Sequence, residues 1–433
     1  MVAIEKAGIP AVAIAARSFA RAWQSCVDGW GQPSTAFVTI PHATTGQQAD
    51  FINKMVDDQI DEIIQHLTFI PSTAGSAKSA RSRGQATEVF TVEMDETPEG
   101  LDAVNRFLAE RDWSDGIPVM PPTPEAVERI LNGTKRAPQD VVMVMEPGFG
   151  LATVEKIAIN AVMAGCRPEQ FPVLLAAIDC LAKPEMNHRD MQVSGHTEAP
   201  IILVNGPIAK KAGLNVGTTA MGPGVINSAN TAIGRALRLC LINIGYCNAG
   251  AGDPNFVGLP SKFGMCIAEN EEDSPWGGLH VSRDFQPEDS CVTVAVAYNP
   301  ITVNNAYGHT GESILASIAD TLRSACLAWR FPAQWVLVIG PEHAITLKED
   351  GWTRRGMQDY LMENASRPLS ELIRLGVAQG PEKPGDDQLV RRCAREADDI
   401  WIVMGGGTGG RNSAIIDTTG YRVRTRKIEM AGG

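Results

Sequence analysis

The fold class is decided by three consecutive segments, IILV (Ile201–Val204), TAIGRALRLCLINI (Thr231–Ile244) and GMCIA (Gly264–Ala268). The first and third are short apolar runs beside turn-forming residues, which is the pattern of buried strands. The second is longer and has an apolar residue or glycine at nearly every position, which is the pattern of a buried helix. Together they predict a strand, a helix and a second strand in succession, as in α/β proteins.

The same alternation continues on both sides of this stretch. Further strands are predicted at Val141–Met145, Val292–Ala297, Trp335–Ile339 and Ile400–Met404, and further helices at Ala152–Ala164, Glu169–Leu181 and Glu312–Trp329. We therefore expect residues 88–433 to form one large α/β or α+β domain that contains the active site.

Residues 1–70 predict a smaller α/β unit. Two strands and two helices are expected in it, at Ile9–Ala15, at Ala36–Ile40, from Arg17 onward and over Gln48–Leu67. We expect an incomplete doubly wound unit, because its first strand begins so close to Met1 that no preceding βα element fits. Residues 71–87, PSTAGSAKSARSRGQAT, are small and polar and predict a linker between the two parts.

Composition restricts the class of protein and of partner. The chain has 433 residues, 44% of them hydrophobic and 20% charged, so it can form two or three packed domains and is not a disordered chain. Its 38 Lys and Arg against 50 Asp and Glu give a net charge of −12, which argues against nucleic acid and anionic membranes as partners. No apolar run reaches the length of a membrane span, and the nine cysteines include no CxxC pair. We expect a cytoplasmic protein whose partner is a small molecule or another protein.

The helix predicted over Thr231–Ile244 carries Arg235 and Arg238 on its single polar stripe. Because so apolar a helix is buried on most sides, the two guanidinium groups must face a solvent slit, an internal carboxylate or a bound anion. The loop before the helix contains glycines and capping residues whose amides favour an anion: Gly222, Gly224, Asn227 and Asn230. One hypothesis is a site for a small anionic substrate. The alternative is a structural stripe paired with internal carboxylates.

A second glycine-rich loop, Gly405-Gly406-Gly407-Thr408-Gly409-Gly410-Arg411, follows the last predicted strand. Its glycines satisfy GxGxxG, but no helical pattern follows and only 23 residues remain after Gly410, so a nicotinamide site is not expected. The backbone amides around Gly407, together with Arg411, could hold a carboxylate or phosphate of the substrate. The alternative is a flexible hairpin.

The segment CIAENEEDSPW (Cys266–Trp276) places carboxylates and a thiol at the end of a predicted strand. Glu269 and His280 are its candidate acid and base, and Cys266 is a candidate reactive thiol. His343, which follows the strand Trp335–Ile339, is a third proton-transfer candidate. As an alternative, Glu271 of the same segment could bind a metal ion together with Glu269, His280 and His343. The alternatives are a solvated acidic loop, structural histidines and an inert buried thiol.

Five blocks of the sequence have a distinctive order: GIPVMPPTPE (Gly116–Glu125), ATVEKIAINAVMAGCRPE (Ala152–Glu169), NSANTAIGRALRL (Asn227–Leu239), CIAENEEDSPW (Cys266–Trp276) and GPEHAITLKEDGW (Gly340–Trp352). Together they resemble the bacterial UGSC family, selenocysteine- or cysteine-containing proteins without one well-defined general activity. The start of the chain, from Ile4 to His42, is similar to the part of the family's N-terminal domain that follows the signature. That signature, Sec/Cys-Gly-Ser-Cys, is absent from this sequence. The resemblance therefore implies either a second chain that carries this segment and its thiol, or a protein that works without it.

From these features we expect a subunit of a cytoplasmic enzyme that acts on a small anionic organic substrate. Its chemistry would be thiol-linked redox or elimination, with the reactive cysteine on a partner chain. Two alternatives stay open: a metal-dependent hydrolase or lyase, and a non-catalytic subunit that stabilises a catalytic partner. The cofactor is left open, with a metal allowed.

Overall fold

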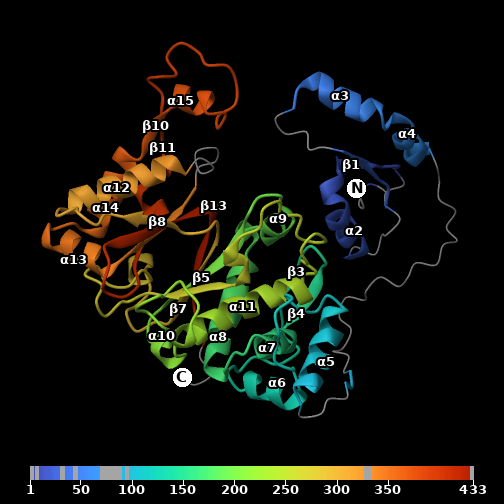
Figure 1. Ribbon diagram of the computed structural model, residues 1–433, viewed down its shortest axis with the longest axis horizontal. Helices are drawn as coiled ribbons and strands as arrows, with labels where there is room; N and C mark the ends of the chain where they lie inside the picture. Colours follow the sequence, from blue (N-terminus) through green and yellow to red (C-terminus); the bar gives the residue numbers. More distant parts are fainter. Residues whose placement is uncertain are drawn as a thin grey trace.

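The structure is a computed structural model that describes Ile4 and residues 9–29, 35–41, 47–68, 90–92, 97–325 and 333–429 (Figure 1). The strands are β1 (Ala13–Ala16), β2 (Phe37–Ile40), β3 (Val141–Met145), β4 (Gly150–Thr153), β5 (Ala199–Asn205), β6 (Met265–Ala268), β7 (Cys291–Ala297), β8 (Ile301–Asn304), β9 (Trp335–Ile339), β10 (Ser366–Pro368), β11 (Val390–Arg392), β12 (Ile400–Met404) and β13 (Asn412–Lys427). The α-helices are α2 (Ala20–Gly29), α3 (Ala49–Asp57), α4 (Ile60–Thr68), α5 (Pro98–Ala109), α6 (Pro124–Leu131), α7 (Val154–Met163), α8 (Phe171–Leu181), α9 (His188–Val193), α10 (Ile208–Lys211), α11 (Ser228–Asn243), α12 (Gly311–Ser324), α13 (Pro341–Glu349), α14 (Arg354–Asn364) and α15 (Leu369–Arg374). The predicted linker, residues 71–87, lies outside the described residues.

The N-terminal unit has its own small sheet. Strands β1 and β2 pair in parallel, with Ala13 opposite Phe37, and α2 lies between them in the sequence. The helix predicted over Gln48–Leu67 is formed as two helices, α3 and α4, which a turn separates. This parallel pair with its connecting helix confirms the predicted α/β class.

The large sheet has the strand order β12-β9-β13-β7-β5-β6, with β8 also paired to β13. The pairs β5·β6 and β9·β12 are parallel, whereas β13 is antiparallel to both β9 and β7. The first half of β13 pairs with β9 and its second half with β7, and the register shifts between Thr418 and Val423. Strand β13 therefore links two half-sheets, β5-β6-β7 and β9-β12.

The two half-sheets face each other across one apolar cluster. Side chains from all six strands contribute to it, among them Leu203 of β5, Ile267 of β6, Val338 of β9 and Val403 of β12. At the carboxyl ends of the strands the half-sheets also touch, because the Asn270 amide donates to the Met404 carbonyl at 2.9 Å. The carboxyl ends of two parallel pairs thus meet on one side of the molecule, where α/β proteins place their ligands.

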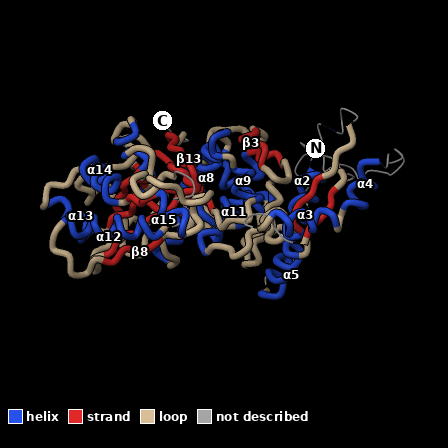
Figure 2. The backbone as a smooth tube through the Cα atoms, turned by 90° about the horizontal axis from the view of Figure 1, so that it is seen from above, coloured by secondary structure: helices blue, strands red, loops and turns tan. Residues whose placement is uncertain are grey.

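Helices cover the outer face of each half-sheet. Helices α7, α8 and α11 pack on the outer side of β5, β6 and β7, and α12, α13 and α14 pack on that of β9 and β12. Figure 2 shows the strands lying between these two groups of helices. Gly234 lets α11 approach the sheet closely, since a Cβ there would lie 2.6 Å from the Met265 amide nitrogen. Within the described ranges, no helix combines the length and apolar character that crossing a membrane would need.

Asp417 is a buried carboxyl group in the middle of β13. Burial raises its pKa to about 8, and its Oδ1 has no hydrogen-bond partner in the described part of the chain. Between pH about 4 and about 8 the group is ionised in the unfolded chain but protonated in the folded one, so its contribution to stability falls as pH rises.

We expect Asp417→Asn to weaken this pH dependence. Between pH 5 and pH 8, urea unfolding should show a larger loss of unfolding free energy for the wild type than for the variant, by up to about 1.4 kcal/mol per pH unit. Asp320→Asn, at a side chain that is 81% exposed, is the matched control and should behave as the wild type. Equal pH dependence in Asp417→Asn and the wild type would contradict the prediction.

Candidate active site

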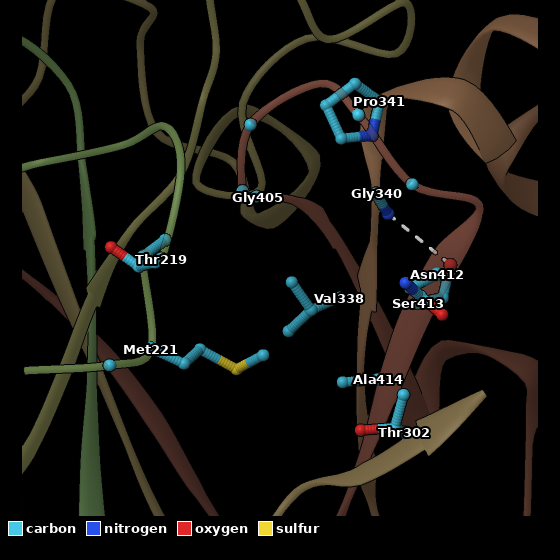
Figure 3. A pocket seen from close by; sticks show the side chains of 16 residues that line it. Thr219, Met221, Thr302, Val338, Gly340, Pro341, Gly405, Asn412, Ser413 and Ala414 are labelled. Carbon is cyan, nitrogen blue, oxygen red and sulfur yellow. Dashed lines mark hydrogen bonds between the residues drawn. The ribbon is translucent and has the colours of Figure 1, made fainter. Parts of the chain in front are cut away.

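A cavity of about 500 Å³ opens at the carboxyl ends of β9 and β12 (Figure 3). Five parts of the chain form its wall: the loop before α11, strand β8, the end of β9 with the start of α13, the loop after β12 and the start of β13. The lining residues are Thr219, Ala220, Met221, Gly222, Thr302, Val338, Gly340, Pro341, Gly405, Gly406, Gly407, Gly409, Gly410, Asn412, Ser413 and Ala414. The two glycine-rich loops predicted separately as binding loops therefore line one site, the first through Gly222 and the second through Gly407.

Asn227 holds the first of these loops in place. Its buried side-chain amide donates to the carbonyls of Thr219 and Gly222, both at 2.6 Å, and its Oδ1 accepts from the Asn215 side chain. Asn230 acts similarly, because its Oδ1 accepts from the Asn215 amide at 2.9 Å. Neither asparagine lines the cavity, so the structure gives them a positioning role. Gly224, with φ 149°, supplies a backbone conformation that L side chains rarely adopt, and it too is absent from the cavity wall.

The second loop is fixed by the first loop and by α13. The Gly406 amide donates to the Val216 carbonyl at 3.2 Å. A Cβ on Gly407 would lie 2.0 Å from Thr218 Oγ1, so the two loops are in contact and leave room only for glycine at this position. Glu342 Oε1 accepts from the amides of Gly409 and Gly410. Burial raises the pKa of Glu342, but these hydrogen bonds outweigh it and leave the pKa below its usual value.

Ser413 and His343 form a hydrogen-bonded pair beside the cavity. Ser413 is among the lining residues, but alternation along β13 turns its side chain to the opposite face from Ala414, toward α13. Its Oγ lies 2.8 Å from His343 Nδ1, and the Gly340 amide donates to the same hydroxyl at 3.4 Å (Figure 3). His343 is fully buried, and burial lowers its pKa. The Asn305 carbonyl opposes this effect, while the charge of Arg411 adds to it.

Arg411 lies beside this pair without lining the cavity. Its guanidinium group donates to the carbonyls of Asn305 and Gly308 and to Thr346 Oγ1. The sequence predicted that Arg411 contacts substrate. In the structure its positive charge lowers the pKa of His343 and so helps to keep that ring neutral.

Glu269, Glu271 and His280 form a second polar cluster, at the ends of β5 and β6. The Asn205 side-chain amide donates to Glu269 Oε2 at 2.6 Å and to Glu271 Oε1 at 2.8 Å. His280 is fully buried, with its Nδ1 3.7 Å from Glu271 Oε1. The carboxylates that follow β6 are thus partly buried rather than fully exposed to solvent.

Glu269 joins the two half-sheets at this cluster. Its Oε1 accepts from the Met404 amide of β12 at 3.2 Å, and its Oε2 from the Leu279 amide at 2.7 Å. Burial raises its pKa to about 7, against the lowering effect of these hydrogen bonds. None of the three predicted residues lines the cavity, whereas His343 lies beside it. Among the described residues, no group of three or more His, Cys, Asp or Glu side chains is arranged to hold a metal ion.

The two arginines of α11 are bound by carboxylates of this chain. Arg235 makes a bidentate ion pair with Asp115, in which the Nε–Oδ2 distance is 2.7 Å and the Nη2–Oδ1 distance is 2.9 Å. Arg238 Nη2 donates to Asp253 Oδ2 at 3.1 Å, and Lys262 shares that oxygen. These contacts agree with the alternative that the arginine stripe is structural. Both guanidinium groups on which the anion-site hypothesis rested are paired with carboxylates of this chain.

The predicted thiol, Cys266, is buried under the helices on the outer face of β6. Burial raises its pKa well above the usual range of a thiol. The same holds for the six other cysteines that the structure describes, for example Cys247, whose pKa is about 11. A buried thiol with a raised pKa is a poor nucleophile.

Sequence reasoning missed Ser413 and Gly340. The apolar run Ala414-Ile415-Ile416, directly after the glycine-rich loop, was the available signal for a strand there and hence for a polar residue at its start.

Comparison with known proteins gives one match. The model of the UGSC family matches residues 1–69. No curated protein and no solved structure matches the chain. The matched residues include β1, β2 and the helices α2 to α4, but none of the residues that line the cavity. The N-terminal segment of this chain, residues 1–69, is therefore similar to the UGSC family.

Proposed function

We propose that this chain is an enzyme, or the catalytic subunit of one, that binds a small organic molecule in the cavity, with His343 as the proton-transfer group beside it. One observation carries this proposal: two glycine-rich loops form the wall of a cavity of about 500 Å³ at the carboxyl ends of the parallel strands β9 and β12, where α/β proteins place their ligands. Buried histidine beside a pocket is a common general base.

The state of His343 supports this role. A ring with a lowered pKa is neutral at pH 7, so one of its nitrogens is free to accept a proton. Its place in the first turn of α13 favours the same state, because the positive end of the helix dipole disfavours an imidazolium ion.

A reactive thiol would have to come from outside the described cysteines. None of the seven lines the cavity, and burial raises the pKa of each. Thiol-linked chemistry at this cavity therefore stays tied to the proposal of a partner chain that carries a Cys-Gly-Ser-Cys segment. The similarity of residues 1–69 to the UGSC family supports that proposal.

Filling the cavity tests the proposed function. Gly222 lines the wall at an unstrained position, where a Cβ meets no atom closer than 3.4 Å, so Gly222→Trp should fill the site without unfolding the chain. In saturation-transfer NMR with acetamide, ethyl acetate and acetate, we expect the wild type to bind at least one probe and Gly222→Trp to lose that binding.

Gly217→Trp is the matched control, since Gly217 does not line the cavity and a Cβ there has its nearest neighbour at 3.6 Å. It should bind as the wild type does. Binding that survives in Gly222→Trp, or no binding of any probe, would contradict the proposed function.

A further inference from the structure

We infer that the cavity selects small uncharged ligands over anions of the same shape, and that Glu342 sets this selectivity. The inference rests on the proposed function and names the class of substrate that the same site accepts. Three features carry it: the uncharged wall, the occupied backbone amides of the two glycine-rich loops, and the carboxylate held beside the second loop.

The wall of the cavity offers an anion no cationic partner. None of the sixteen described residues that line it has an ionisable side chain. Arg411, which follows the second loop, does not line the cavity, and its guanidinium group donates to the carbonyls of Asn305 and Gly308. An anion that leaves water for this site would therefore lose its hydration without gaining an ion pair.

Backbone amides of both glycine-rich loops are already used within the chain. In the first loop the Gly222 amide donates to the Thr219 carbonyl at 2.7 Å. In the second loop the amides of Gly405 and Gly406 donate to backbone carbonyls, at 3.1 and 3.2 Å. Glycine-rich loops that bind anions present free amides to the ligand, and these three lining amides are not free.

Glu342 occupies the part of the second loop that would otherwise attract an anion. Its Oε1 accepts from the amides of Gly409 and Gly410, which both line the wall. It also lies in the first turn of α13, directly after Pro341 of the wall, so the positive end of that helix already has an anion beside it. Burial raises the pKa of Glu342, but the hydrogen bonds outweigh this effect and hold the pKa below its usual value, so the side chain is ionised at pH 7. Its charge would repel a second anion in the cavity.

Acetamide and acetate test the inference, because the two molecules have the same shape and differ in charge. Dissociation constants are measured at pH 7 by saturation-transfer NMR, with Gly222→Trp as the background for each probe. In the wild type we expect the constant for acetamide to be roughly tenfold lower than that for acetate. Ethyl acetate, which is also uncharged, should compete with acetamide.

Glu342→Gln isolates the role of the carboxylate. The glutamine Oε1 can still accept from the two glycine amides, so the wall should keep its shape. Acetate binding should tighten roughly threefold, while acetamide binding should stay unchanged. Glu349→Gln is the matched control, since it makes the same change of charge at an exposed position in the last turn of α13, and it should keep the wild-type ratio of the two constants.

Equal constants for the two probes in the wild type, or tighter binding of acetate, would overturn the inference and leave the proposed function intact. A wild-type ratio in Glu342→Gln would overturn the role given to Glu342. Binding of neither probe to the wild type would overturn the inference together with the proposed function. The wild-type comparison needs no variant of Glu342, so it keeps the test valid if Glu342→Gln fails to fold.

Discussion

Replacing Arg235 with methionine is expected to lower the free energy of unfolding by about 3 kcal/mol and to leave binding in the cavity unchanged. The guanidinium group holds Asp115 with two hydrogen bonds and also donates to the carbonyls of Ile117 and Pro118. Both ion-pair partners are largely buried, with 15% and 9% of their side chains exposed. Methionine would leave the Asp115 carboxylate without its partner, which is the costly way to break a buried pair.

Urea unfolding of three variants separates this effect from a general loss of charge. Arg355→Met removes an arginine that is 64% exposed and paired with Asp359, and it should change stability by no more than about 0.5 kcal/mol. Adding Asp115→Asn to Arg235→Met should recover part of the loss, because no unpaired charge then remains. Unchanged stability with weakened probe binding in Arg235→Met would instead restore the anion-site hypothesis.

Gly407→Val is expected to weaken probe binding in the cavity roughly 100-fold. A Cβ on Gly407 would lie 2.0 Å from Thr218 Oγ1 and 2.6 Å from the Thr218 backbone nitrogen. Because part of this contact is backbone, a rotamer change cannot relieve it, and the two loops must separate. The displacement would reach Gly406 and Gly222, which both line the wall.

Gly217→Val is the control for the loop that holds Thr218. A Cβ at Gly217 meets only Asn215 Oδ1, at 3.6 Å, so this substitution should leave binding and the unfolding midpoint near those of the wild type. Circular dichroism and thermal unfolding should show Gly407→Val folded, since the clash lies between surface loops. Wild-type affinity in a folded Gly407→Val would mean that the contact between the two loops does not shape the cavity.

Strand and helix positions in the large domain were predictable because most of its elements are apolar almost throughout. Trp335–Ile339 and Ile400–Met404 are formed at the predicted bounds. The long strand β13 was not predicted. Its central residues, Asp417, Thr418, Thr419 and Gly420, break the apolar pattern at the point where the strand passes from one half-sheet to the other.

The sequence predicted the two loops of the site but not that they lie together. Glycine spacing identified the loops that contain Gly222 and Gly407, but no local pattern shows that they line one cavity. The partner of Arg235 is Asp115, 120 residues earlier in the chain, so sequence alone could not choose between a bound anion and an internal carboxylate. Ser413 was missed because its strand was missed.

Methyl NMR of protein labelled at the methionine methyl groups tests the cavity as a ligand site most directly. Met221 points into the cavity, whereas Met120 is 58% exposed and does not line it (Figure 3). Met221→Leu and Met120→Leu would assign the two signals. On titration with ethyl acetate we predict that the Met221 signal shifts saturably and the Met120 signal stays in place. Saturable binding of ethyl acetate that leaves the Met221 signal unmoved would contradict the account.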